Sequence, residues 1–353
     1  MSWKKTLSLR LTHQKAAAYI SIIITHHHLQ ISTMKERMHR VCATDNNYAA
    51  LCGIMLSSLL ENNRHRPISV YILTDGLKPG HCKRLKSLAE SGKYDAEINI
   101  CVIDTKALEG CDTSHNPYLA KYLNKAVFSR FLIADILPAD CKKCLYLDCD
   151  IVVDGDISEL YDTDITDYAV AAVPEHDGES GRCIGKEAIE RLNYPLKSGY
   201  FNAGVMLINL SYWRENDVKH AAISYFVNNV KKCFFFDQDV LNAILHDKKL
   251  FLPYKYNVMA SFFECAFEDF TALLIEERPV IIHYCSAAKP WNWYFGDYPF
   301  KNRWKSYRNR SKWKHWRSRM PFKKLVKEIA RNILYFSKGK RYRYYRSSWR
   351  KWE

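Results

Sequence analysis

One stretch of the sequence decides the fold: Lys143-Cys144-Leu145-Tyr146-Leu147-Asp148-Cys149-Asp150-Ile151-Val152-Val153. An apolar strand, predicted over 144–147, runs directly into two aspartates. In open α/β sheets ligands gather at the carboxyl ends of strands. Side chains at positions i and i+2 of an extended segment point the same way, so Asp148 and Asp150 can share one cation. An acidic surface turn is the alternative, because Asp154 and Asp156 continue the acidity.

Strands and helices are predicted to alternate upstream of this stretch, as in parallel α/β folds. The predicted strands cover 40–44, 68–74 and 98–103, and the predicted helices cover 48–60, 79–91 and 122–137. Further on, strands are predicted at 169–173, 201–208 and 280–284, with a helix at 237–246. The pattern predicts one α/β domain over residues 38–300, with a Rossmann-like central sheet flanked by helices.

The charge of the chain is concentrated at one end. The 353 residues include 53 Lys and Arg against 38 Asp and Glu, but residues 301–353 hold 20 of the cations and only two of the acids. Residues 1–300 are therefore slightly acidic, which argues against a folded nucleic-acid platform. Hydrophobic residues make up 48% of the chain, which is typical of globular proteins rather than disordered ones.

The two ends of the chain receive separate predictions. Residues 1–37 are interpreted as a disordered leader or as the result of a start codon placed too early, since Met34 and Met38 precede the first predicted strand. Residues 301–353 interleave their cations with twelve aromatics, and 322–336 are predicted to form a basic amphipathic helix on an anionic inner-membrane surface. Nucleic-acid binding by this tail is the alternative, which we rank lower.

The twelve cysteines do not predict a disulfide framework. Four of them, Cys42, Cys52, Cys101 and Cys285, lie within apolar runs, where thiols behave as small buried hydrophobes. Cys141 and Cys144 form a single CxxC without the second pair that a zinc site usually has. This usage is typical of a reducing cytoplasm, where we expect the protein to act.

A histidine offers a third ligand for the cation predicted at the aspartates. His283 lies at the end of the apolar strand predicted over 280–284, and small residues and Lys289 follow it. Two carboxylates and one imidazole suit Mn²⁺ better than Mg²⁺, which prefers oxygen ligands. A divalent ion would bridge to a diphosphate, as in nucleotide-dependent enzymes. A histidine satisfied within the core is the alternative.

A polar triplet, Asp237-Gln238-Asp239, opens the helix predicted over 237–246. Capping of the helix N-terminus and a favourable interaction with the helix dipole would explain Asp237 without any function. Gln238 is uncharged and is less readily explained in that way.

Five motifs, in order along residues 41–291, together resemble those of glycosyltransferase family 8, especially its bacterial lipopolysaccharide α-galactosyl- and α-glucosyltransferases. The motifs are Ala43-Thr44-Asp45-Asn46-Asn47-Tyr48, Leu145-Tyr146-Leu147-Asp148-Cys149-Asp150, Tyr200-Phe201-Asn202-Ala203-Gly204-Val205, Asp237-Gln238-Asp239 and the segment from His283 to Trp291. Five ordered motifs are far more specific than an isolated Asp-x-Asp. The resemblance implies a GT-A fold, a UDP-hexose donor, Mn²⁺ (with Mg²⁺ as the alternative) and retention of configuration at the anomeric carbon. It also implies a lipid-linked glycan acceptor, reached from the cytoplasmic face of the inner membrane.

The resemblance also assigns roles to individual residues. The metal ligands implied are Asp148, Asp150 and His283. The donor contacts implied are Ala43, Asp45, Asn47, Tyr48, Arg130, Asp148, Asn202, Ser286 and Lys289, and Asp237 and Gln238 are the expected catalytic residues. The chain departs from the family in having Ser286 where Gly is usual and Asn46 where Asp is usual.

Two other function classes stay open at this point. A sugar-phosphate nucleotidyltransferase shares the α/β fold, but it normally has a Gly-rich loop after the first strand, and residues 43–50 contain no glycine. A non-enzymatic nucleic-acid-binding protein would act through residues 301–353. For the transferase, we expect front-side transfer beside Gln238 rather than a covalent intermediate, because an amide is a poor nucleophile.

Overall fold

The computed structural model describes residues 36–115, 125–175, 184–263, 277–285, 289–292 and 298–318, together with Val326, Ile329 and Ala330. The predicted leader, apart from its last two residues, and nearly all of the predicted helix over 322–336 lie outside the described residues. The residues before Met38 form a unit separate from the one that begins there.

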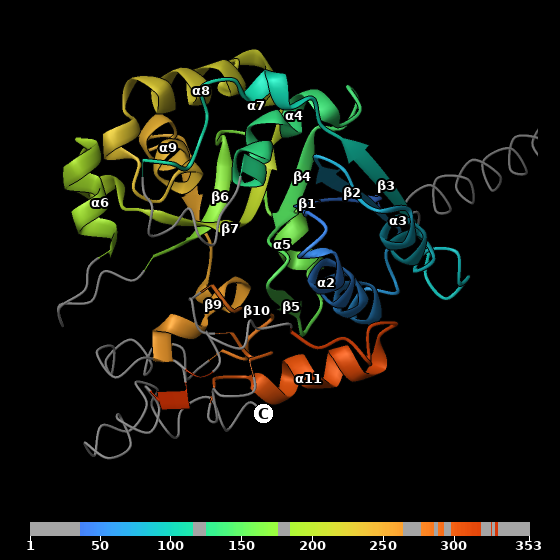
Figure 1. The fold of residues 1–353 in the computed structure, drawn as a ribbon. Coiled ribbons are helices and arrows are strands. Elements are labelled where there is room, and N and C mark those ends of the chain that lie inside the picture. The colour runs from blue at the N-terminus through green and yellow to red at the C-terminus, as the bar shows by residue number, and fades with distance from the viewer. Residues whose placement is uncertain are drawn as a thin grey trace, which may run out of the picture. The chain divides into compact units, whose positions relative to one another are not determined.

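A seven-stranded sheet with the order β3-β2-β1-β4-β7-β6-β8 forms the centre of this second unit (Figure 1). Its strands are β1 (Met38–Ala43), β2 (Ile68–Thr74), β3 (Ala96–Val102), β4 (Lys143–Leu147), β6 (Val170–Pro174), β7 (Phe201–Asn209) and β8 (Lys249–Phe251). The first four strands run parallel, whereas β7 is antiparallel to both of its neighbours. The predicted strands are confirmed to within two residues at each end.

Side chains of the central strands alternate between two apolar layers, because successive residues of a strand point to opposite faces. In β2, Val70 and Ile72 belong to one layer and Tyr71 and Leu73 to the other. Helices α2 (Ala49–Asn62), α3 (Pro79–Lys86) and α5 (Ser158–Asp162) cover the first layer; α4 (Ile133–Ile136), α7 (Leu210–Glu215), α8 (Val218–Asn228) and α9 (Asp237–Ile244) cover the second (Figure 1). Burial of both faces explains why these strands read as continuous apolar runs.

A second, three-stranded sheet has the order β5-β10-β9. β5 (Ile151–Val153) pairs antiparallel with β10 (Ile281–His283), and β10 pairs parallel with β9 (Val258–Met259). In this register His283 lies opposite Ile151, directly beside the acidic stretch. β9 was not predicted, because a strand of two residues is too short to show a period.

The prediction of one long helix over 122–137 is wrong. The described part of this segment is a 3₁₀ helix, η2 (Lys125–Leu132), followed by the single turn α4. Phe128 and Phe131 are buried three residues apart, a spacing that fits a 3₁₀ helix as well as an α-helix. Helix α3 also ends early, at Lys86 rather than Ser91. The remaining short elements are α6 (Ile184–Leu192), η1 (Thr105–Leu108), η3 (Leu196–Ser198), η4 (Val230–Lys232), η5 (Tyr254–Tyr256) and η6 (Ala260–Phe263).

The first part of the basic C-terminal segment is packed into the fold. Helix α11 (Lys301–Arg310) lies against α2 and β5, and Trp304, Tyr307 and Trp313 are buried. Gly53 of α2 permits this contact, because the Trp313 ring occupies the space that a Cβ at Gly53 would need. These three aromatics were expected at a membrane surface, and that expectation is wrong for them because they complete the core. Membrane binding stays a prediction for the residues that follow.

None of the helices in the described part of the chain combines the length and apolarity needed to cross a bilayer.

Candidate active site

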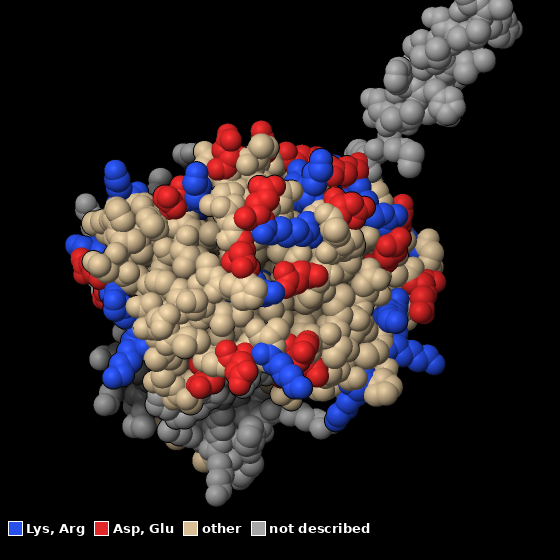
Figure 2. All heavy atoms as spheres, turned by 90° about the horizontal axis from the view of Figure 1, so that it is seen from above, with Lys and Arg blue, Asp and Glu red and all other residues tan. Residues whose placement is uncertain are grey.

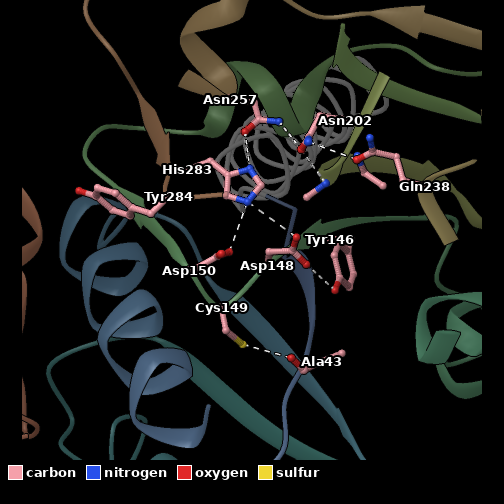
Figure 3. Close-up of polar contacts among 12 residues, drawn as sticks. Ala43, Tyr146, Asp148, Cys149, Asp150, Asn202, Gln238, Asn257, His283 and Tyr284 are labelled. Carbon is pink, nitrogen blue, oxygen red and sulfur yellow. Dashed lines mark hydrogen bonds and ion pairs between the residues drawn. The ribbon is translucent and has the colours of Figure 1, made fainter. Parts of the chain in front are cut away.

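The turn between β4 and β5 presents two carboxylates to the histidine of β10 (Figure 3). The backbone N–H of Asp148 donates to the carbonyl oxygen of Gly204 at 2.9 Å, and the N–H of Tyr284 donates to the carbonyl oxygen of Asp150 at 2.9 Å. These bonds tie the turn to β7 and β10. As a result, Nε2 of His283 lies 3.8 Å from Asp148 Oδ2 and 3.3 Å from Asp150 Oδ1.

The geometry of these three side chains fits a divalent cation. One ligand atom from each lies within 4.8 Å of the other two. Gly204 borders the cluster, and a Cβ there would overlap the imidazole and come within 2.8 Å of Asp148 Oδ2. The side chains of Asp148 and Asp150 are only 27% and 14% exposed, so the acidic surface turn considered above is not what the structure contains.

Asn257 orients the imidazole of His283 and was missed by the sequence reasoning. Its Oδ1 lies 3.0 Å from His283 Nδ1, and both residues are buried. Because Asn257 Nδ2 donates to Asn202 Oδ1 at 3.0 Å, the amide presents its oxygen to the ring. An amide oxygen only accepts, so Nδ1 donates to Asn257 and Nε2 is the ring nitrogen that faces the carboxylates.

The hydrogen-bonded chain continues from Asn202 to Gln238 (Figure 3). Oε1 of Gln238 accepts from Asn202 Nδ2 at 3.2 Å and from the N–H of Ala203 at 3.0 Å. Its Nε2 donates to the hydroxyl of Tyr200 at 3.2 Å. Two residues selected from the sequence, Asn202 and Gln238, are thus joined to His283 through Asn257.

Glu175 adds a carboxylate beside Gln238 and was also missed. Its Oε1 accepts from Asn202 Nδ2 at 2.8 Å and lies 3.4 Å from Gln238 Nε2. Glu175 directly follows β6, as Asp148 follows β4. A polar residue after an apolar strand was therefore the signal that could have identified it.

Arg130 connects Asp237 to Asp148. One terminal nitrogen of its guanidinium lies 2.8 Å from Asp237 Oδ2 and the other 3.1 Å from Asp148 Oδ1, and the group stacks on the Tyr146 ring. Asp237 is buried and does not cap α9, whose N-cap residue is Phe236. Burial raises the pKa of Asp237 to about 7, although Arg130 opposes the rise.

The remaining residues selected from the sequence lie around the acidic stretch. Asp45 Oδ1 accepts the N–H groups of Asn47 and Tyr48, at 2.9 and 2.8 Å, where the chain passes from β1 into α2. The carbonyl oxygen of Ala43 accepts from the thiol of Cys149 at 3.2 Å, which places the end of β1 beside the acidic turn.

Lys289 reaches the same turn from the segment after β10. Its Nζ lies 2.6 Å from Asp150 Oδ2 and 2.6 Å from the carbonyl oxygen of Tyr284. Burial raises the pKa of Asp150, but Lys289 and His283 outweigh burial and hold this pKa below its usual range. Ser286 lies outside the described residues.

Three thiols pack behind the acidic turn. Cys42 Sγ and Cys52 Sγ are 3.7 Å apart, and Cys149 Sγ lies within 4.8 Å of both. All three residues are buried. The prediction of small buried core residues is confirmed for Cys42 and Cys52 but not for Cys101 and Cys285, which are only half-buried.

The segment that contains these residues matches one known protein family. The sequence model named "Glycosyl transferase family 8" matches residues 39–293, which is most of the chain. The chain belongs to glycosyltransferase family 8. The family predicted from the five motifs is therefore confirmed.

The relatives of this family 8 chain include a stress protein and two lipopolysaccharide glycosyltransferases. It is 33% identical to general stress protein A of Bacillus subtilis (strain 168), over 73% of this chain and 88% of that protein. It is 31% identical to lipopolysaccharide 1,3-galactosyltransferase of Salmonella typhimurium, over 72% of this chain and 73% of that protein. It is also 31% identical to an Escherichia coli lipopolysaccharide 1,2-glucosyltransferase, over 83% and 81% of the two chains.

The solved structures of glycosyltransferases confirm the GT-A fold. The galactosyltransferase LgtC, solved with donor and acceptor sugar analogs, matches with a TM-score of 0.63 at 21% identity, over 78% of this chain and 96% of LgtC. The glycosyltransferase GlyE of Streptococcus pneumoniae TIGR4 matches with a TM-score of 0.56 at 21% identity, over 89% of this chain and 66% of GlyE.

The ionisation of Asp237 should make the stability of this family 8 chain depend on pH. Its pKa is about 7 in the fold and about 3.9 in an unfolded chain, so between these values only the folded state holds the proton. The free energy of unfolding should therefore fall as pH rises from about 4 to 7, and this fall should be absent in Asp237→Asn. Urea unfolding of both proteins at pH 5 and pH 7.5 measures the difference. An equal pH dependence in both would show that Arg130 keeps Asp237 ionised throughout.

Proposed function

We propose that this chain is a Mn²⁺-dependent, retaining hexosyltransferase that transfers galactose or glucose from a UDP-sugar to a lipopolysaccharide or lipooligosaccharide acceptor. The observation that carries the proposal is the convergence of Asp148, Asp150 and His283, with Nε2 of the imidazole facing both carboxylates. The acceptor class is proposed from the relatives that are named lipopolysaccharide galactosyl- and glucosyltransferases.

The acidic turn and Lys289 would form the side of the site that receives the leaving group. Asp148, Asp150 and His283 would hold Mn²⁺, with Mg²⁺ as the alternative, and this cation supplies positive charge to the UDP leaving group. Lys289, beside Asp150, contributes a second positive charge on the same side. Preorganised charge of this kind usually stabilises a transition state more than any other feature of an active site. Ser286 would contact the diphosphate from the same segment.

Two groups of residues would hold the donor. Ala43, Asp45, Asn47 and Tyr48, at the end of β1, would contact the uracil and ribose. Arg130, Asn202 and Asp237 would hold the hexose, since they connect the acidic turn to the catalytic candidate Gln238. The hydrogen bonds of these residues to one another keep their positions before the donor arrives.

Gln238 would face the anomeric carbon as the donor bond breaks. Its Oε1 is held by two N–H donors, and the carboxylate of Glu175 lies beside its amide. Electron-rich oxygens of this kind stabilise a sugar that becomes cationic. Because an amide is a poor nucleophile, front-side transfer on the same face accounts for retention. A glycosyl adduct trapped on Gln238, Asp237 or Glu175 and seen by mass spectrometry would overturn this step.

Replacing Asn257 by Leu should weaken activation by Mn²⁺. The substitution removes the hydrogen bond that orients His283, and loss of such an orienting partner typically lowers metal affinity about 10- to 100-fold. The Mn²⁺ concentration for half-maximal UDP release should rise by about that factor. Turnover at saturating Mn²⁺ should recover. Asn216→Leu, at an exposed amide, is the control, and an unchanged Mn²⁺ dependence in folded Asn257→Leu would contradict the orienting role.

The proposed acceptor also predicts where the enzyme acts and which other molecules it contacts. A lipid-linked acceptor places the protein peripherally on the cytoplasmic face of the inner membrane, and residues 319–353 would contact the anionic lipids there. Figure 2 shows cations and acids interspersed on one face, without a large patch of either sign. Nucleic acid ranks below membrane as a partner because the proposed acceptor is lipid-linked, and membership of family 8 favours glycosyl transfer over nucleotidyl transfer.

The experiment that tests this function measures UDP release by the purified protein with a panel of UDP-sugars, in Mn²⁺ or in EDTA. Slow release from UDP-galactose or UDP-glucose that EDTA stops is the expected result, and the preferred sugar identifies the donor. Absence of UDP binding by folded protein would overturn the proposal.

A further inference from the structure

A basic pocket of about 250 Å³ lies beside α11, in a part of the molecule to which the transferase site assigns no role. Two tryptophans and four cations dominate its lining: Trp291, Trp304, Lys301, Lys305, Arg308 and Arg317. None of the lining residues that the structure describes is acidic.

The spacing of three of these cations places them on one face of α11. Lys301, Lys305 and Arg308 occupy positions i, i+4 and i+7, which lie above one another in an α-helix. Like charges at this spacing destabilise a helix, so their placement together has a cost. Asp154 contacts a different face of α11, since its Oδ2 lies 3.7 Å from Nε of Arg303, which does not line the pocket.

Burial increases the mutual repulsion of the pocket cations. Lys301 is only 9% exposed. The pKa of its ammonium group is lowered mainly by burial and further by the charge of Lys305. The pKa of Arg308 is likewise lowered mainly by burial and further by the charge of Arg317. A bound anion would relieve both repulsions, and a buried cation interacts with it more strongly than an exposed one.

The tryptophans give the pocket flat apolar walls beside its charges. The ring centroids of Trp291 and Trp304 are 5.4 Å apart, and both rings also contact Trp316. The guanidinium of Arg308 lies 5.4 Å from the Trp304 ring centroid. Aromatic walls with a few convergent polar groups are typical of sites for small molecules that contain a ring. An ion alone would need only the cations.

The pocket is connected to the acidic turn by a short segment. Trp291 lies two residues after Lys289, whose Nζ is 5.7 Å from the Trp291 ring centroid and contacts Asp150. Residues 289–291 would therefore contact both the proposed metal site, through Lys289, and a ligand that packs against Trp291.

We propose that this pocket binds a phosphorylated sugar unit of the acceptor, with Lys301, Lys305 and Arg308 on the phosphate and the tryptophans against the ring. The inference rests on the proposed function, because it anchors one part of the acceptor glycan away from the hydroxyl that reacts. A concave site with a buried lysine fits a discrete phosphate ester, whereas a flat lipid surface would contact only exposed cations.

The test measures binding of glucose 6-phosphate, glucose and inorganic phosphate by calorimetry to the full chain. The double variant Lys305→Gln/Arg308→Gln is compared with Arg310→Gln, whose guanidinium belongs to the same helix but stacks on Tyr307 instead. Each charged contact to a phosphate contributes about tenfold in affinity, so the double variant should bind glucose 6-phosphate about 100-fold more weakly. Arg310→Gln should bind like the wild type, and glucose should bind far more weakly than its phosphate.

Three outcomes would overturn the inference. Glucose 6-phosphate that binds the wild type no better than glucose would exclude a phosphate site, and inorganic phosphate that binds equally well would exclude the sugar. Phosphatidylglycerol vesicles whose binding requires Lys305 and Arg308, without competition from glucose 6-phosphate, would identify a lipid site instead. Mn²⁺-dependent UDP release should persist in every variant, so failure of the pocket is distinguished from failure of the transferase assignment.

Discussion

Replacing Asp148 by Asn should lower UDP release by about 10³-fold or more, the scale on which removal of a preorganised charge slows an enzyme. The carboxylate has two roles in the proposed site. It faces His283 Nε2 as a metal ligand, and it pairs with Arg130, which also holds Asp237. The amide of Asn retains the shape but not the charge, so both metal binding and the position of Arg130 are weakened. UDP release from the preferred UDP-hexose at several Mn²⁺ concentrations measures the effect.

Asp156→Asn is the matched control for this experiment. Asp156 lies in the same acidic run, but its side chain is 54% exposed and does not belong to the cluster with His283. Its replacement should leave UDP release unchanged. Thermal unfolding in EDTA shows whether Asp148→Asn keeps the fold. Near wild-type turnover in a folded Asp148→Asn protein would show that the metal assignment is wrong.

Replacing Gln238 by Ala should lower kcat by about 10²-fold and leave the KM for the donor nearly unchanged. The lost Oε1 is the oxygen proposed to face the anomeric carbon in the transition state, so its removal affects the reacting state more than donor binding. The substitution also leaves the N–H groups of Asn202 and Ala203 without this acceptor. Initial rates of transfer over a range of donor concentrations separate kcat from KM.

The outcome for Gln238 also distinguishes positioning from catalysis. A KM that rises with an unchanged kcat would show that Gln238 only binds the donor. Asn228→Ala removes an exposed amide of α8 and should leave both constants unchanged. A loss of the same size in this control would point to a general effect of losing an amide rather than to the site.

The central strands were predicted closely because both of their faces are buried. A strand such as β2 must be apolar at every position, and that pattern is visible within seven residues. The polar residues that end such runs stand out for the same reason, so Asp148, Asp150 and His283 were identified together. The helix predicted over 122–137 failed because an apolar spacing of three does not distinguish a 3₁₀ helix from an α-helix.

The sequence by itself determined the α/β class, the five family motifs and the residues that end the apolar strands, because each of these is a pattern of neighbouring residues. Only the tertiary structure decided that Asn257 orients His283 and that Glu175 lies beside Gln238. It also decided that α11 joins the core and encloses a basic pocket with Trp291. The physical reason is that these contacts join segments from different elements, and strand register and helix packing, which no local pattern records, bring them together.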